Sequence, residues 1–441
     1  LTNNQSNSIS STLLQCLGER VKFSAMHDSS ARSYPPRCHP DTRKTLRSRI
    51  VDWGLRSGYG ERMFWVLGPP AVGKSAVAQT TAEEFKEKDR LGASFFFSRP
   101  NNLDDPDWVI PTLSYQLAVK HSHYKNIITQ LLIDDPSILE KNRPTQFRQL
   151  IIEPFRTLMT KPPDTVREPL LIILDGLDEC KDKQAQCEFI DLISTHVQQV
   201  ENFPLRWMIC SRPEWHFKPM ILDPDLRVVC KREEIEFYDR EARGDVERLL
   251  EAGLDNIRKK YSDRLPAGWP LAKDHIQHIA AAISGHLGLV SFILRFVEDE
   301  ECGDPDGRLQ ICVRFFDGSG GTVGTPNPLH AIDLLYRQIL SSVPVERLPT
   351  ARRILGLAII SRIHFSTSGE QASFLNLDWA TFQRSLQHLH SVVSVPRMNE
   401  PGVTLHVYHA SFSDFLMDSN RSGNYWLNKE AAECDYVLQC L

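Results

Sequence analysis

Residues 62–79 read Arg-Met-Phe-Trp-Val-Leu, then Gly68-Pro69-Pro70-Ala71-Val72-Gly73-Lys74-Ser75, then Ala76-Val-Ala-Gln. A short apolar run, a G-x-x-x-x-G-K-S pattern and a helix-forming stretch, in that order, are typical of a phosphate-binding loop. The two glycines permit backbone conformations that a Cβ excludes, so successive N–H groups can turn toward one anion. The helix that follows presents the positive end of its dipole to the same anion. We therefore expect residues 68–76 to cradle phosphate groups.

Two side chains of this loop have separate predicted tasks. Lys74 adds a positive charge for the outer phosphates of a nucleotide, and the Ser75 hydroxyl can ligate Mg²⁺. The alternative is a turn that matches the pattern by coincidence. The order of strand, loop and helix favours the phosphate loop.

A second motif is the apolar run Leu170–Leu174, which ends in Asp175-Gly176-Leu177-Asp178-Glu179. A carboxylate at the end of such a strand can hold Mg²⁺, mostly through water, so Asp175 is the candidate metal ligand beside Ser75. Asp178 or Glu179 could orient or deprotonate the water that attacks a terminal phosphate. The alternative is a buried strand followed by a solvated acidic turn.

Two further residues have two open interpretations each. Arg212 follows the apolar run Arg206–Cys210, where its planar guanidinium could stabilise charge on a γ-phosphate or simply pair with Glu214. His409 precedes apolar residues at helical spacing, and this pattern by itself favours a structural histidine over a ligand.

The first half of the chain alternates strands and helices, which predicts a parallel α/β sheet with helices on both faces. The candidate strands are Met63–Leu67, Ala93–Phe97, Leu170–Leu174 and Arg206–Cys210. Polar residues follow these strands, and ligands of open α/β sheets bind at that edge.

We expect four segments along the chain. Residues 1–40 form a poorly packed lead-in and linker, and residues 41–242 form the nucleotide-binding domain. Residues 243–325 form a helical domain with an irregular, Gly-rich connection over Cys302–Pro328. Residues 326–441 read as helices followed by a β-hairpin, which suggests a winged-helix domain.

Composition excludes several classes of protein. The formal net charge of the chain is −5. Residues 326–441 hold nine Lys and Arg against ten Asp and Glu, so this segment lacks the excess of basic residues that nucleic-acid binding normally requires. No apolar run is long enough to span a membrane. Ten scattered cysteines without a C-x-x-C pair favour a reduced, cytoplasmic chain. The chain begins with Leu1 and shows no signal peptide, so we expect a fragment or a processed product.

Motifs along residues 36–441 resemble those of NACHT-type STAND NTPases, especially the fungal NLR-like proteins with a nephrocystin-like N-terminal part. The matching stretches are Cys38–Arg43, the phosphate loop, Ser94–Arg99, Leu174–Glu179, Ser211–Glu214, Asp304–Leu309, Leu334–Leu340, His409–Leu416 and Arg421-Ser422. A small residue after the metal-binding aspartate, here Gly176, followed by further acids is the feature that marks NACHT proteins.

The resemblance implies a signalling switch in which an ADP-bound closed form exchanges to ATP, opens and forms a homo-oligomer. It implies that Arg212 reads the γ-phosphate and that His409 contacts the ADP β-phosphate. It also implies ATP rather than GTP, slow hydrolysis, protein partners bound through effector and sensor-repeat regions outside this chain, and a role in fungal non-self recognition or cell death. The alternatives are an ATPase that turns over continuously and an interaction scaffold whose nucleotide is structural.

Overall fold

The computed structural model of the chain describes residues 17, 20–32, 35–56, 60–160, 168–199, 203–235, 240–266, 268–269, 273–283, 287–298, 303–318, 328–361, 365, 367–389, 392–395, 402–408 and 410–440. The chain forms two compact units. Unit 1 contains Leu1–Pro69, Gly73–Ser98 and Leu103–Ile235, and unit 2 contains Pro70–Val72, Arg99–Asn102 and Glu236–Leu441.

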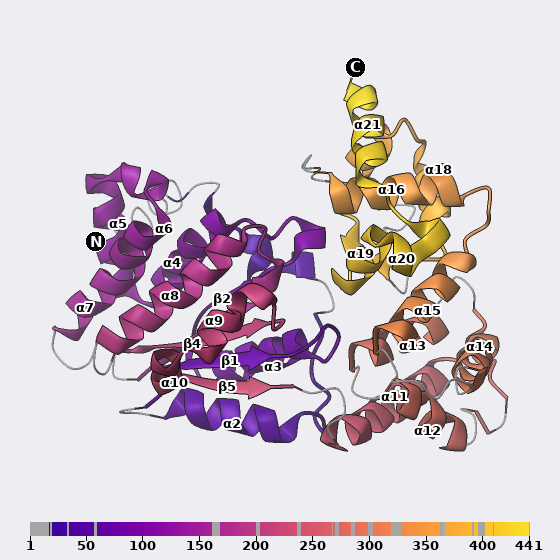
Figure 1. Cartoon of the computed structure of the whole chain (residues 1–441), viewed down its shortest axis with the longest axis horizontal. Helices are drawn as coiled ribbons and strands as arrows, with labels where there is room; N and C mark the ends of the chain where they lie inside the picture. The colour runs from indigo at the N-terminus through magenta and orange to yellow at the C-terminus, as the bar shows by residue number, and fades with distance from the viewer. Residues whose placement is uncertain are drawn as a thin grey trace. The chain divides into compact units, whose positions relative to one another are not determined.

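Unit 1 is built on a five-stranded sheet in which every pair of neighbours is parallel (Figure 1). The strands lie in the order β2-β3-β4-β1-β5. They are β1 (Met63–Leu67), β2 (Leu91–Phe96), β3 (Leu170–Asp175), β4 (Leu205–Ser211) and β5 (Cys230–Glu234). Every residue of β1 to β4 is buried, as expected for strands covered on both faces.

Helices cover both faces of this sheet, which confirms the predicted fold class. Successive side chains of a strand point to opposite faces. Trp65 therefore packs into a cluster with α4, α5, α7 and α8, whereas Phe64 meets the ring of Trp53 on α2. The helical elements of unit 1 are η2 (Phe23–Ala25), η3 (Ser30–Arg32), α2 (Lys44–Leu55), α3 (Lys74–Glu87), η5 (Pro106–Trp108), α4 (Val109–Lys120), α5 (Ser122–Asp134), η6 (Pro136–Glu140), α6 (Arg143–Gln146), η7 (Phe147–Ile152), α7 (Glu153–Met159), η8 (Leu177–Glu179), α8 (Lys183–Gln199), η9 (Trp215–Phe217), α9 (Lys218–Leu222) and α10 (Pro224–Val229).

The described residues near the N-terminus are packed against unit 1, so the predicted poor packing of this segment is wrong for them. Val21, Ala25 and Met26 are buried in the same cluster as the sheet. The backbone N–H of His27 donates to Ser94 Oγ on β2 at 3.1 Å. This packing could not be predicted because the segment is Ser-rich. Its partners lie on α3 and β2, which come later in the chain.

Unit 2 is mainly helical, and a small antiparallel sheet of two strands lies between α18 and α19. Its elements are η4 (Arg99–Asn101), α11 (Arg240–Lys260), α12 (Lys273–Ala282), α13 (Leu287–Glu298), α14 (Pro305–Gly318), α15 (Pro328–Ser341), α16 (Leu348–Ile360), α17 (Ser368–Phe374), α18 (Trp379–Leu386), β6 (Val393–Ser394), β7 (His406–Val407), α19 (Ala410–Met417), α20 (Ser419–Ser422), η11 (Gly423–Tyr425) and α21 (Lys429–Cys440). The irregular connection predicted over Cys302–Pro328 is wrong in part, because α14 occupies Pro305–Gly318. Its proline fits the first position of a helix, where no intrahelical N–H is needed.

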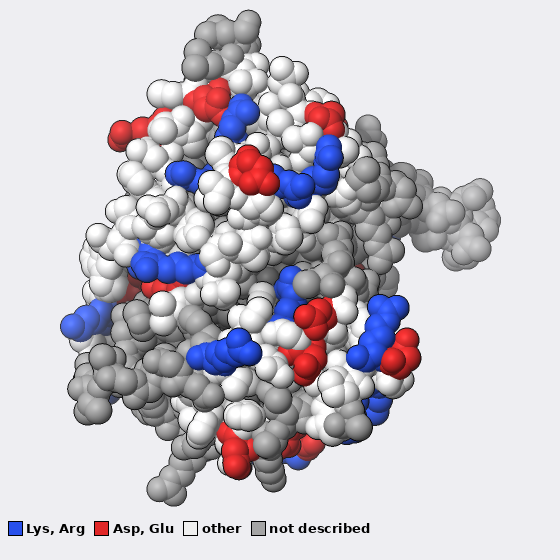
Figure 2. All heavy atoms as spheres, turned by 90° about the vertical axis from the view of Figure 1, so that its right-hand side faces the viewer, with Lys and Arg blue, Asp and Glu red and all other residues white. Residues whose placement is uncertain are grey.

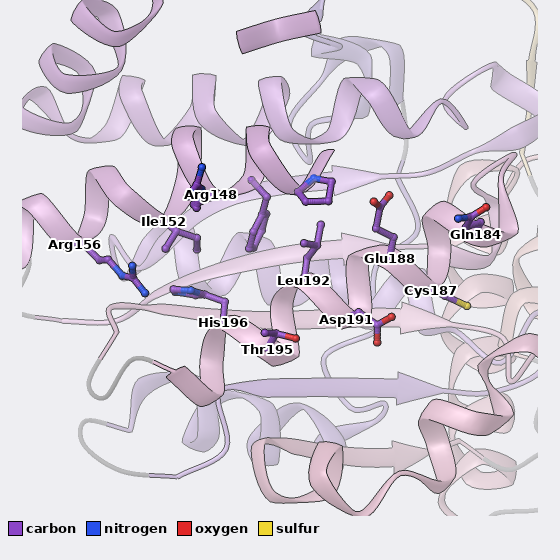
Figure 3. A pocket seen from close by; sticks show the side chains of 12 residues that line it. Arg148, Ile152, Arg156, Gln184, Cys187, Glu188, Asp191, Leu192, Thr195 and His196 are labelled. Atoms are coloured by element: carbon purple, nitrogen blue, oxygen red, sulfur yellow. The ribbon is translucent and has the colours of Figure 1, made fainter. Parts of the chain in front are cut away.

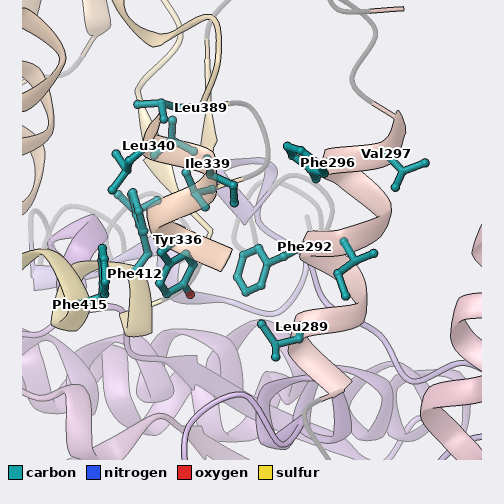
Figure 4. Close-up of a cluster of buried hydrophobic side chains, with 14 of the residues drawn as sticks. Leu289, Phe292, Phe296, Val297, Tyr336, Ile339, Leu340, Leu389, Phe412 and Phe415 are labelled. Carbon is teal, nitrogen blue, oxygen red and sulfur yellow. The ribbon is translucent and has the colours of Figure 1, made fainter. Parts of the chain in front are cut away.

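Aromatic side chains join the helices of unit 2 (Figure 4). Tyr336 of α15 lies 5.0 Å from Phe412 and 5.3 Å from Phe415 of α19, measured between ring centroids. Phe292 of α13 lies 5.9 Å away on the other side. The Tyr336 hydroxyl shares a hydrogen bond of 2.8 Å with Ser411 Oγ, so this buried ring keeps a polar partner.

On the face drawn in Figure 2, the described basic and acidic side chains are interspersed and not gathered into one basic area. Among the described helices, none is both long enough and apolar enough to cross a bilayer.

Candidate nucleotide site

The predicted phosphate loop connects β1 to α3, as the motif requires. Gly73 caps the N-terminus of α3 with φ of 94°, a left-handed conformation that favours glycine. Gly68 donates its N–H to the carbonyl oxygen of Ser211 at the end of β4, at 3.3 Å. Ala71, between Pro70 and Val72, also has a positive φ of 62°. The backbone of the loop therefore turns sharply beside two strand ends, with Ala76 in the first turn of α3.

Lys74 lies with its ammonium group inside this loop. Its Nζ donates to the carbonyl oxygens of Gly68 at 2.6 Å and Pro69 at 2.7 Å. Burial lowers the pKa of Lys74, whereas the Asp178 carboxylate raises it. The lysine is thus a partly buried cation held by neutral carbonyl groups, and a phosphate would be a stronger partner for it than they are.

Asp175 ends β3 and is only 3% exposed. Burial raises the pKa of its carboxyl to about 6, opposed by a hydrogen bond from Ser75 and by the charges of Arg32 and Lys74. Within the described part of the chain, its Oδ1 is buried without a hydrogen-bond partner. A buried, partnerless carboxylate oxygen beside a serine hydroxyl fits a hard cation such as Mg²⁺, which takes oxygen ligands.

The two other acids follow in the turn η8. Gly176 has φ of 71°, and a Cβ at this position would lie 3.2 Å from the carbonyl oxygen of Phe97. A glycine is therefore required for the chain to turn directly after Asp175. The Asp178 residue is 8% exposed, and the Glu179 backbone N–H closes the turn onto the Gly176 carbonyl at 2.7 Å.

Arg212, the residue after β4, is held by Asp178. The Arg212 backbone N–H donates to Asp178 Oδ1 at 2.9 Å, and Arg212 Nε lies 3.2 Å from Asp178 Oδ2. The side chain of Arg212 is 21% exposed and that of Asp178 is 5% exposed. The sequence offered Glu214 or a γ-phosphate as partners for this arginine, and the pairing with Asp178 was not foreseen.

Strand order explains how these residues meet. Because β4 lies between β1 and β3, the carboxyl ends of all three strands are adjacent at one edge of the sheet. Lys74, Asp175, Asp178 and Arg212 therefore gather from three separate motifs. Cys210, opposite Asp175 on β4, is a buried neighbour that sequence reasoning did not single out. His409 lies outside the described residues, so its predicted role is not placed.

A separate hollow of about 530 Å³ lies along α8 (Figure 3). Arg156 and His196 stand toward one end of it, and Glu188 and Gln184 toward the other. The ring of His196 packs on Phe203, just before β4 begins, so that end of the hollow lies away from the phosphate loop.

One comparison with known protein families covers the part of the chain that holds these residues. Residues 44–212 match the family model described as Nephrocystin 3, N-terminal. This nephrocystin-like segment runs from the first residue of α2 to Arg212, and it contains the phosphate loop and all the acids described above. The nephrocystin-like part of the resemblance is therefore confirmed for this stretch. No curated protein matches the chain.

Solved structures also align with most of the chain, at low sequence identity. The Walker-type ATPase paby2304 of Pyrococcus abyssi is 13% identical, covers 87% of this chain and 98% of its own, and has a TM-score of 0.43. The Aeropyrum pernix ORC2 protein is 13% identical; the match covers 94% of this chain and 98% of the ORC2 chain, with a TM-score of 0.38. Cdc6p from Pyrobaculum aerophilum is 15% identical; the match covers 94% of this chain and 99% of the Cdc6p chain, with a TM-score of 0.38.

Proposed function

We propose that the chain is the ATP- and ADP-binding core of a STAND-class switch of the NACHT type. It couples nucleotide exchange and slow hydrolysis to homo-oligomerisation, in the setting of fungal non-self recognition or cell death. Protein partners act through effector and sensor-repeat regions outside this chain. The proposal rests on the grouping of Lys74, Asp175, Asp178 and Arg212 at one edge of the sheet, together with the match of the nephrocystin-like segment.

The observation that carries the proposal is the pair of Asp178 and Arg212. Asp178 accepts the Arg212 N–H and faces its guanidinium, so in this arrangement the carboxylate is engaged and does not serve as a base. A terminal phosphate that drew the guanidinium away would free Asp178 Oδ2, while Oδ1 would keep the backbone N–H of Arg212. A contact that differs between two nucleotide states is what a switch requires, because a ligand shifts an equilibrium only by its differential affinity.

The residues of the loop and strand ends have defined tasks in this proposal. Lys74 exchanges its carbonyl partners for phosphate oxygens. The backbone N–H groups near Gly73 would donate to the same anion. Ser75 and Asp175 would hold Mg²⁺, which when bound neutralises phosphate charge. Glu179, beside the turn at Gly176, remains the second candidate for orienting water.

The test is the nucleotide carried by the purified chain, measured beside a Lys74→Ala variant. We expect tightly held ADP in the native chain. A charged hydrogen bond contributes about 1.5–3 kcal/mol, so the variant should bind roughly 10- to 100-fold more weakly. Hydrolysis should be much slower than the 1–100 s⁻¹ typical of kinases, in the order of one turnover per minute or less.

Each rival function has its own signature in the same experiment. Continuous turnover at rates near 1 s⁻¹ would replace the switch by a working ATPase. Bound nucleotide that never exchanges into added ATP would favour the scaffold. Equal nucleotide content in the native chain and in Lys74→Ala would show that the loop does not bind phosphate, and the proposal would be wrong.

A further inference from the structure

The N-terminal strap, residues 20–32 and 35–38, is fastened along the helix that follows the phosphate loop. Its partners on α3 lie on one face of that helix, at Gln79, Thr80, Glu83 and Lys86. The contacts are Gln79 Nε2 to the His27 carbonyl at 3.0 Å, the Cys38 N–H to Thr80 Oγ1 at 2.9 Å, Arg37 Nε to Glu83 Oε1 and Oε2 at 2.8 and 2.9 Å, and Lys86 Nζ to Asp28 Oδ2 at 2.6 Å.

Arg32 of the strap contacts the sheet as well as α3. The guanidinium of Arg32 lies over the ring of Phe96 on β2, 3.6 Å from its centroid. Arg32 Nη1 donates to Gln79 Oε1 at 2.8 Å. The arginine is therefore held between a strand of the sheet and the phosphate-loop helix.

Both of these partners are neighbours of the predicted metal ligands. Phe96 stands opposite Asp175 in the register of β2 and β3, so the two side chains share a face of the sheet. Gln79 follows Ser75 by four residues on α3, which places both on one side of the helix. The Arg32 guanidinium thus lies beside the pair of Ser75 and Asp175.

The electrostatics agree with this placement. Burial lowers the pKa of Arg32 to about 10, while the Asp175 carboxylate raises it, so the side chain stays charged at neutral pH. Arg32 in turn lowers the pKa of Asp175, against the larger effect of burial. Asp175 is thereby flanked by cations on both sides, Arg32 from the β2 side and Lys74 from the loop.

We propose that Arg32 is a positioning residue of the nucleotide site, through which docking of the N-terminal strap on α3 is coupled to binding of a magnesium–nucleotide. The inference rests on the proposed function. A nucleoside di- or triphosphate brings more negative charge than one Mg²⁺ neutralises, so the occupied site attracts Arg32 more strongly than the empty one. Because coupling is reciprocal, nucleotide tightens the strap, and the docked strap tightens nucleotide binding.

The experiment measures backbone hydrogen exchange of the strap, residues 20–32 and 35–38, with and without MgADP, together with MgADP affinity. The native chain is compared with Arg32→Ala, Arg32→Lys and Arg37→Ala. The last variant is the matched control, since it removes the other arginine anchor of the strap without touching the neighbourhood of Asp175.

We expect MgADP to slow exchange of the strap in the native chain and in Arg37→Ala, but not in Arg32→Ala. Affinity should fall about tenfold in Arg32→Ala, within the usual range of coupling between linked sites. It should fall about threefold or less in Arg37→Ala, because an exposed ion pair contributes little. Arg32→Lys, which keeps the charge but loses the planar stack, should recover part of both effects.

Two results would overturn the inference and leave the proposed function standing. If the native chain binds MgADP and the strap exchanges equally fast with and without it, the coupling does not exist. If Arg32→Ala and Arg37→Ala behave alike, Arg32 is an ordinary anchor. A native chain that binds no nucleotide overturns the proposed function along with the inference, and the affinity measurement separates that case from the first two.

Discussion

The two units each contain an arginine–aspartate pair of similar burial but different surroundings. In unit 1 Arg212 faces Asp178, and in unit 2 Arg421 of α20 faces Asp333 of α15. Both arginine side chains are 21% exposed. Arg421 makes the closer contact, with Nη2 at 2.7 Å from Asp333 Oδ1 and Nε within 3.2 Å of both carboxylate oxygens.

The surroundings decide what each pair can do. The Arg421 backbone carbonyl also accepts from Arg337 Nε at 2.9 Å, so the pair in unit 2 is part of a clamp between α15 and α20. The pair in unit 1 stands beside Lys74 and the buried Asp175, where an arriving anion could replace the carboxylate. We conclude that pair geometry alone does not separate a structural ion pair from an exchangeable one.

The largest expected effect comes from breaking the clamp of unit 2. Arg421→Ala leaves Asp333, whose side chain is 13% exposed, without its cation. Loss of one partner of a buried pair costs about 3–5 kcal/mol, and with this exposure we expect about 2–4 kcal/mol of unfolding free energy. Denaturant unfolding followed by a probe in unit 2 measures it.

The matched control lies in the same unit. Arg353 and Asp435 form a pair at 2.7 Å in which both side chains are 35% exposed. Arg353→Ala should cost under about 1 kcal/mol, since exposed pairs are weak. Equal losses in the two variants would contradict the view that Arg421 is a clamp.

The second and smaller expected effect is a loss of stability at low pH in unit 1, which contains the buried His196. Burial lowers the pKa of His196 to about 4, with Arg156 and Arg62 adding to the effect. The unfolded chain takes up this proton near pH 6.5, whereas the folded chain resists until about pH 4. Stability from this group is therefore complete above pH 6.5 and falls between 6.5 and 4, by about 1–3 kcal/mol in total.

The variant His196→Phe should remove that part of the acid sensitivity, since the ring already packs on Phe203 and faces Phe147. Unfolding of unit 1 measured at pH 7.5, 6, 5 and 4.5 would show a shallower loss than in the native chain. The same pH slope in both chains would mean that other groups account for it.

Much of the fold of unit 1 could be predicted because its inner strands are short, apolar and bounded by turns. The edge strand β5 escaped prediction because it reads Cys-Lys-Arg-Glu-Glu. An edge strand tolerates charged side chains, which help prevent pairing with other chains, so composition does not mark it. In unit 2, α14 was hidden because its flanks contain Pro and Gly, the residues that signal a loop.

In the candidate site, too, local motifs could be predicted and contacts between distant segments could not. The positions of the G-x-x-x-x-G-K-S loop and of Asp175 at the end of a strand could be predicted because each motif is local and has a backbone requirement, such as the left-handed Gly73 and Gly176. The partner of Arg212 could not be found, because it depends on β4 lying beside β3 in the sheet. The contacts of Arg32 with Gln79 and Phe96 could not be predicted either, since only folding brings a Ser-rich segment onto α3.

The smallest expected change in stability belongs to Arg212→Ala, the counterpart of Arg421→Ala. Asp178 keeps a donor, the backbone N–H of residue 212 at 2.9 Å, and the charge of Lys74 nearby. We therefore expect a loss of about 1 kcal/mol or less, comparable to a single net hydrogen bond.

The effect of this variant should appear instead in nucleotide selectivity, measured by binding of MgATP and MgADP to the folded chain. A guanidinium that meets the terminal phosphate contributes to ATP and not to ADP, so the ratio of the two affinities should change about tenfold, or about 1.4 kcal/mol. A stability loss as large as that of Arg421→Ala with an unchanged ratio would make Arg212 a second clamp. The exchangeable pair would then have to be sought elsewhere, because Asp178 would be bound to its arginine in every nucleotide state.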